Sequence, residues 1–148
     1  MEDGGGPGGE SGDDPRGIIA GGRRLISSGG PWEAIAGYSR AVIVGSACWV
    51  AGTSDAGPDG HSLHPGDSVA QARDAFGRID AALARGGFER GDIVRIRIFV
   101  TDMTAAPGLL ALMGELFGSI RPAASLIGVS TLIEPSLIVE IEADAQRA

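Results

Sequence analysis

Apolar side chains recur at spacings of three and four residues in one long segment, which predicts an amphipathic helix. The segment lies between Asp67 and Gly86, and its predicted apolar face consists of Val69, Ala72, Phe76, Ile79 and Leu83. Asp67 or Ser68 can cap its start, and Gly86-Gly87 can end it. A second helix is predicted to begin at Pro107, with an apolar stripe of Leu109, Leu112, Met113 and Leu116.

Alternation of apolar and polar positions predicts strands on either side of these helices. Two β-prone runs, Arg40–Val44 and Ala47–Ala51, are joined by Gly45-Ser46 and predict a hairpin. Further strands are expected at Arg24–Ser27, Ile93–Val100 and Leu137–Ala145. The predicted order is therefore β-ββ-α-β-α-β, an α+β fold whose two helices cover one face of a sheet.

The other face of this sheet carries charged and aromatic side chains. By alternation it receives Arg95, Arg97, Phe99, Glu140 and Glu142. One interpretation is a wet interface between subunits that holds a pocket. The alternative is a solvent-exposed face with ordinary ion pairs, and the periodicity favours neither.

The chain of 148 residues is long enough for one domain with a hydrophobic core. Residues 1–22 are rich in glycine and acidic side chains, and we expect a flexible tail there. The folded domain is expected to span residues 23–148. No apolar run approaches the length of a membrane span, and Cys48, the one cysteine, rules out an intrachain disulfide. These features are typical of a cytoplasmic protein that does not bind membranes.

Charge and residue types exclude several activities. The net charge of −7 disfavours a nucleic-acid partner, since phosphate backbones are repelled by an acidic chain. All 12 basic residues are arginines, so no lysine exists to form a Schiff base. His61 and His64 lie in a glycine-rich loop without a regular scaffold, and we interpret them as polar loop residues rather than metal ligands. We therefore expect no metal and no cofactor.

An ordered set of short motifs resembles the RidA/YjgF family of reactive-intermediate deaminases. The set runs from about Ser27 to Ala145 in the family's order, and each motif alone is weak. The motifs are Tyr38-Ser39-Arg40-Ala41 with Val44-Gly45, Val50-Ala51-Gly52-Thr53, Gln71 in the first helix, Val100-Thr101-Asp102, Arg121-Pro122-Ala123 and Val139-Glu140-Ile141-Glu142-Ala143.

The resemblance implies a chorismate-mutase-like homotrimer with metabolite pockets between its subunits. Members of the family hydrolyse imines and enamines such as 2-aminoacrylate without a metal or cofactor. By this resemblance Glu140 is the catalytic acid/base. The implied substrate-binding positions are Tyr38, Gly52, Ala124 and Ser125.

The chain departs from the family at the arginine that holds the substrate carboxylate, because that position is Ala124. We therefore expect 2-aminoacrylate to be a poor substrate, since a bidentate arginine–carboxylate pair is lost. The loop before the last strand is also one residue longer than usual. Arg97 is a candidate replacement, and its alternative role is an ion pair with Glu140 or Glu142.

Two kinds of function remain open from the sequence. The first is an enzyme that performs hydrolytic deamination or proton transfer on an imine, enamine or related carbonyl compound, with Glu140 as acid/base. It includes a tailoring enzyme of specialised metabolism, for which Ala124 leaves room for a larger neutral substrate. The second is a regulatory trimer that binds a metabolite without turnover. For Glu140 itself, the alternative is a solvated carboxylate or an ion pair between subunits.

Overall fold

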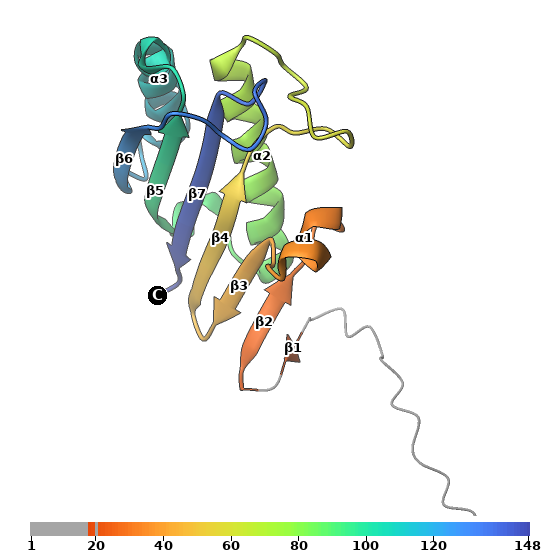
Figure 1. Ribbon diagram of the computed structural model, residues 1–148. Coiled ribbons are helices and arrows are strands. Elements are labelled where there is room, and N and C mark those ends of the chain that lie inside the picture. The colour runs from red at the N-terminus through yellow and green to blue at the C-terminus, as the bar shows by residue number, and fades with distance from the viewer. Residues whose placement is uncertain (1–17, 20) are drawn as a thin grey trace, which may run out of the picture.

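The computed structural model describes residues 18–19 and 21–148, which form a seven-stranded sheet with helices packed against it (Figure 1). The strand order is β1-β2-β3-β4-β7-β5-β6. The strands are β1 (Ile18–Ile19), β2 (Arg23–Ile26), β3 (Ala41–Val44), β4 (Ala47–Thr53), β5 (Ile93–Val100), β6 (Ala123–Gly128) and β7 (Val139–Gln146). The helices are α1 (Pro31–Ala36), α2 (Ser68–Gly86) and α3 (Ala106–Phe117), with short 3₁₀ turns at Arg90–Asp92 and Met103–Ala105.

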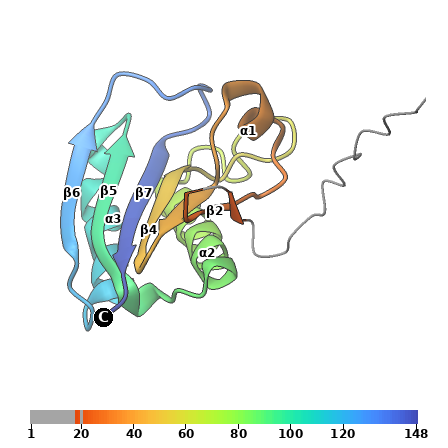
Figure 2. The same cartoon turned by 90° about the horizontal axis from the view of Figure 1, so that it is seen from below.

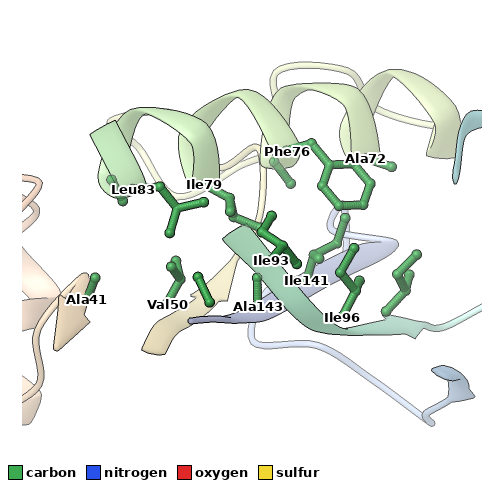
Figure 3. Close-up of a cluster of buried hydrophobic side chains, with 14 of the residues drawn as sticks. Ala41, Val50, Ala72, Phe76, Ile79, Leu83, Ile93, Ile96, Ile141 and Ala143 are labelled. Atoms are coloured by element: carbon green, nitrogen blue, oxygen red, sulfur yellow. The ribbon is translucent and has the colours of Figure 1, made fainter. Parts of the chain in front are cut away.

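The two long helices, α2 and α3, lie on the same face of the sheet, as the sequence predicted (Figure 2). The core lies between α2 and the sheet, where Phe76, Ile79 and Leu83 point toward a layer of buried strand residues that includes Ile96 and Ile141 (Figure 3). All five side chains are almost completely buried. Each such burial contributes about 1.5–3 kcal/mol relative to an exposed side chain. This packing fixes which face of the sheet remains uncovered.

Helix α2 has the ends that the sequence predicted. The Asp67 side chain accepts a hydrogen bond from the backbone N–H of Ala70 and caps the helix. At the other end Gly87 adopts φ 80°, a left-handed conformation that glycine takes without steric cost.

Helix α1 was not predicted, because Gly29, Gly30 and Pro31 suggested a broken stretch instead. Pro31 in fact starts the helix, where its missing N–H costs nothing. Glu33 then stabilises this turn by accepting hydrogen bonds from the backbone N–H groups of Ser28, Gly30 and Arg40. The carboxylate thereby fixes the backbone of Arg40 at the entry to β3.

Strand β6 was also missed, and it is the one parallel neighbour in the sheet. It pairs with β5 in parallel, and α3 makes the connection between them. The small residues Ala123, Ala124 and Ser125 give this strand a weak β-propensity, so its pairing depends on the crossover and not on local sequence.

The buried Gln71 side chain fixes the start of β7. Its Nε2 donates to the carbonyl oxygens of His64 and Ser136, and its Oε1 accepts from the N–H groups of Ile138 and Val139. A buried amide with all these partners satisfied stabilises one arrangement of the loops around it. The residue that follows Val139 is Glu140, so this network holds the backbone of the candidate site.

The predicted tail, residues 1–22, falls largely outside the described residues. Within it, β1 pairs antiparallel with β2. None of the helices in the described part of the chain combines the length and apolar character needed to cross a membrane.

Candidate functional site

Glu140 lies on the face of β7 that the helices do not cover. Burial alternates along this strand, so that Val139, Ile141 and Ala143 are buried under the helices while Glu140 and Glu142 point the other way. Strand β7 is flanked by β4 and β5, and Phe99 of β5 is the direct neighbour of Glu140. The alternation of core-facing and uncovered residues that the sequence predicted for this strand is confirmed.

Gly52 of β4 makes room for the Glu140 carboxyl group. A Cβ atom on residue 52 would come within 3.0 Å of the Glu140 carboxyl carbon, and within 3.1 and 3.3 Å of its two oxygens. The pairing of β4 with β7 is irregular between Val50 and Thr53, so Gly52 sits at a bulge. Strand bulges often re-aim side chains next to functional sites. A side chain at position 52 would therefore require the Glu140 carboxyl group to shift by a few tenths of an ångström.

Arg40 places a positive charge beside this pair, and sequence reasoning did not single it out. Its Nη2 donates to the carbonyl oxygen of Gly52 over 2.6 Å. Burial lowers the pKa of Arg40, while Tyr38, Glu33 and Glu140 nearby favour its charged form. The signal available in the sequence was an arginine directly before the predicted strand that begins with Ala41.

The environment of Glu140 favours its protonated form. Burial raises the pKa of the Glu140 carboxyl, Arg40 acts against this rise, and the like charge of Glu142 adds to it. A half-buried carboxyl group with a raised pKa can exchange protons closer to neutral pH than an exposed one. The site can therefore donate and accept a proton without a metal.

Tyr38 and Arg97 line a cavity of about 820 Å³ on the same uncovered face. The cavity is also lined by residues of β2, β3, β4 and β7, among them Leu25, Val42, Trp49, Ala51, Glu142 and Asp144. Arg97 Nη1 is 3.1 Å from a Glu142 oxygen and 3.5 Å from an Asp144 oxygen. This geometry matches the alternative in which Arg97 pairs with Glu142.

Ala124 and Ser125 lie on β6, two strands away from β7, and both are exposed. In the register of the sheet Ala124 stands beside Ile96, whose side chain is in the helix-covered core. Side chains of paired residues point to the same face, so Ala124 and Glu140 lie on opposite faces of one subunit. Within a single chain these two predicted site residues do not come together.

The two histidines are bound to carboxylates instead of forming half of a metal site. His61 Nδ1 is 2.9 Å from Glu134 Oε1, and His64 Nδ1 is 3.0 Å from the buried Asp55. Among residues 18–19 and 21–148 no three His, Cys, Asp or Glu side chains gather in a way that could hold a metal ion. Cys48 is buried, and burial raises the pKa of its thiol to about 11, which disfavours the reactive thiolate.

The family, the relative and the solved structures that this chain matches agree with one another. Residues 30–147 match the family described as Endoribonuclease L-PSP. A 2-iminobutanoate/2-iminopropanoate deaminase of Dermatophagoides farinae is 30% identical over 125 residues, which cover 81% of this chain and 98% of that protein. A crystal structure of Rv2704 from Mycobacterium tuberculosis, a member of the YjgF/YER057c/UK114 family, is 43% identical with a TM-score of 0.76. The match covers 84% of this chain and 99% of that one. The YjgF gene product of E. coli is 29% identical with a TM-score of 0.71, covering 84% and 98%.

Proposed function

Because the chain belongs to the RidA/YjgF family, we propose that it is an enzyme that acts on an imine, enamine or related carbonyl metabolite through Glu140. The observation that carries this proposal is the half-buried Glu140 carboxyl, seated against Gly52 with its pKa raised by burial. Some relatives are named imine deaminases, which supports this reaction class.

The hydrolysis of an imine moves both protons of one water molecule to the imine nitrogen, and one carboxyl group can relay them in turn. In the addition step, the Glu140 carboxylate would take a proton from water while the water oxygen attacks the imine carbon, and would then return this proton to the nitrogen, which gives a carbinolamine. In the elimination step, it would take the proton of the carbinolamine hydroxyl and deliver it to the amino group, which leaves as ammonia while the carbonyl forms. One water is consumed, and no electrons are exchanged with a cofactor. Acid/base groups of this kind typically contribute about 10²–10⁴-fold in rate.

Arg40 is proposed as the cation of the site in place of Arg97. Arg97 is held by Glu142 and Asp144, whereas Arg40 binds the carbonyl of Gly52, the residue that touches Glu140. A positive charge there limits how far burial raises the pKa of Glu140, which keeps part of the carboxyl population ionised and able to act as the base.

The active form is proposed to be a homotrimer with its pockets between subunits. The uncovered sheet face exposes Trp49 by 48% and Val44 by 44%, and apolar side chains on a sheet face without covering helices offer a surface for a second subunit. In addition, Glu140 and Ala124 lie on opposite faces of one chain, so a pocket that contains both positions needs a second copy. The proposed ligand is a small metabolite, with no nucleic acid partner because the net charge is −7.

The substrate class is proposed to exclude small 2-imino acids such as the one derived from 2-aminoacrylate. By the family resemblance Ala124 stands where a carboxylate-binding arginine is usual, and an exposed alanine cannot hold an anion. A larger and less charged imine fits the site better. The alternative function is a trimer that binds such a metabolite without turnover.

The experiment is a panel of imines generated in solution, some from amino acids by an amino-acid oxidase and others, which lack the carboxylate, from amines by a flavin-dependent amine oxidase. The rate of carbonyl release is compared with and without the full-length protein. We expect acceleration for at least one large imine without a carboxylate and little for the imine of alanine. Saturable binding across the panel with no acceleration anywhere would contradict the enzyme and favour the binding protein.

A further inference from the structure

A second pocket lies away from the cavity of the sheet face, between α2 and the chain that enters β3. Its volume is about 260 Å³, and we refer to it as the arginine pocket. It is lined by Ser28, Arg40, Arg78, Ala81, Ala82 and Arg85. Three of these side chains carry guanidinium groups, and none of the lining residues is acidic. This is unusual in a chain with a net charge of −7.

The spacing along α2 explains how the pocket forms. Residues 78, 81, 82 and 85 recur at intervals of three and four and therefore share one face of the helix. Arg78 and Arg85 stand one above the other at two turns' separation, and the small side chains of Ala81 and Ala82 leave space between them. Arg40 closes the pocket from the side of the sheet.

The guanidinium groups are anchored through backbone carbonyls, which leaves them with hydrogen-bonding capacity. Arg40 donates to Gly52, Arg78 donates to Ala56 over 2.8 Å, and Arg85 donates to Ser27. Each guanidinium has five N–H donors, so one anchor occupies a minor part of them. The Nε of Arg40 is buried and has no hydrogen-bond partner. A buried donor without a partner costs free energy unless a ligand or water satisfies it.

The carboxylates around the pocket neutralise only part of its charge. Asp74 forms an ion pair with Arg78 at Nε over 2.5 Å, and Glu33 accepts hydrogen bonds from Ser28 of the pocket and from the backbone N–H groups of Gly30 and Arg40. The neighbouring C-terminal end of α2 disfavours an anion. Charge-assisted hydrogen bonds from two guanidinium groups are stronger than this effect of the helix end.

We propose that the arginine pocket binds a small oxyanion, the phosphate or carboxylate group of a metabolite, at a site distinct from the cavity of the sheet face and joined to Glu140 only through Arg40. Guanidinium groups recognise both anions through paired N–H···O contacts. The binding would satisfy Arg40 and connect α2 to the end of the sheet that carries Gly52. It does not depend on whether Glu140 performs catalysis.

The test is titration of the full-length protein with inorganic phosphate, and separately with acetate, at constant ionic strength and followed by NMR. We expect saturable shifts confined to α2 and the residues before β3. Preference for phosphate or for acetate identifies the source of the anion, and either result supports the pocket. No saturable shift at millimolar concentrations of either probe would overturn the proposal.

Two pairs of variants distinguish this pocket from general attraction of anions. Arg85→Gln removes one exposed guanidinium and should weaken binding roughly ten-fold or more. Its control, Arg73→Gln, lies on the same helix but faces Glu115 of α3, and it should bind like the native chain. Ala81→Glu places a carboxylate in the pocket and should abolish binding, whereas Ala84→Glu, exposed on α2 outside the pocket, should not. Equal weakening in a variant and its control would overturn the proposal.

Discussion

Gly52 and Glu140 lie on adjacent strands, so close that a Cβ atom on residue 52 would come within 3.0 Å of the Glu140 carboxyl carbon. Contacts this short are tighter than most Cβ contacts in proteins, so any other residue at position 52 would require the carboxyl group to shift by a few tenths of an ångström. The position of the Glu140 carboxyl group therefore depends on a glycine that has no side chain to take part in the reaction.

Substitution of this glycine tests the relationship. In Gly52→Ala we expect turnover to fall ten-fold or more while the fold is kept, because one methyl group moves the acid/base group and small misplacements are costly in catalysis. The measurement is kcat with an imine that the native chain hydrolyses. Gly77→Ala is the matched control, because residue 77 lies in α2 with open space around it. It should keep full activity and gain roughly 0.5–1 kcal/mol of stability. Native activity in Gly52→Ala would contradict the account.

The raised pKa of Glu140 also predicts how stability depends on pH. Burial makes the folded state bind the proton of Glu140 more tightly than the unfolded state does. Its contribution to stability is therefore complete below the ordinary carboxyl pKa and is lost as the pH rises through the raised one. In Glu140→Gln this loss is absent, so the variant should be at least as stable as the native chain at neutral pH. Urea unfolding at several pH values measures this, and a less stable Gln variant at neutral pH would contradict it.

A substitution of Trp49 tests whether the protein forms the proposed trimer. The Trp49 side chain lies on the uncovered sheet face and is 48% exposed in the single chain. Trp49→Glu should place a charge in the subunit interface and shift the mass in light scattering from three chains of 15.0 kDa to one. Leu110→Glu, on the outer side of α3 and 59% exposed, should stay trimeric. A native chain that is already monomeric at micromolar concentration would contradict the proposal.

A substitution of Ala124 tests the proposal that small 2-imino acids are poor substrates. The side chain is exposed on the edge strand β6, so Ala124→Arg should fold normally. We expect the variant to gain activity on the imine of alanine, because an arginine–carboxylate pair can then form. The native chain should have little activity on this substrate. A native rate equal to that of relatives with the arginine would show that another cation holds the carboxylate, and Arg97→Gln would then identify or exclude Arg97.

The regular part of the fold followed from the periodicity of the sequence. Strand β5, helix α2 and the alternation in β7 were predicted closely, because one side of each is buried and the other is not. Helix α1 and strand β6 were not predicted, each for a different reason. A proline that starts a helix resembles one that breaks it, and β6 depends on pairing with β5 across α3 more than on its own residues.

The candidate site was predictable only in part. Resemblance identified Glu140 and Gly52, but their mutual contact depends on a bulge in β4 that local sequence does not reveal. Arg40 was overlooked because its importance comes from contacts across the end of the sheet. The opposite orientation of Ala124 and Glu140 likewise depends on strand register, which the missed strand β6 sets.

The most direct test of the central claim is the turnover of Glu140→Gln on the best imine of the panel. Gln keeps the shape of the side chain and removes its proton chemistry, so kcat should fall by roughly 10²–10⁴-fold while the trimer and ligand binding are retained. A Gln variant that turns over the substrate at the native rate would remove Glu140 from the mechanism.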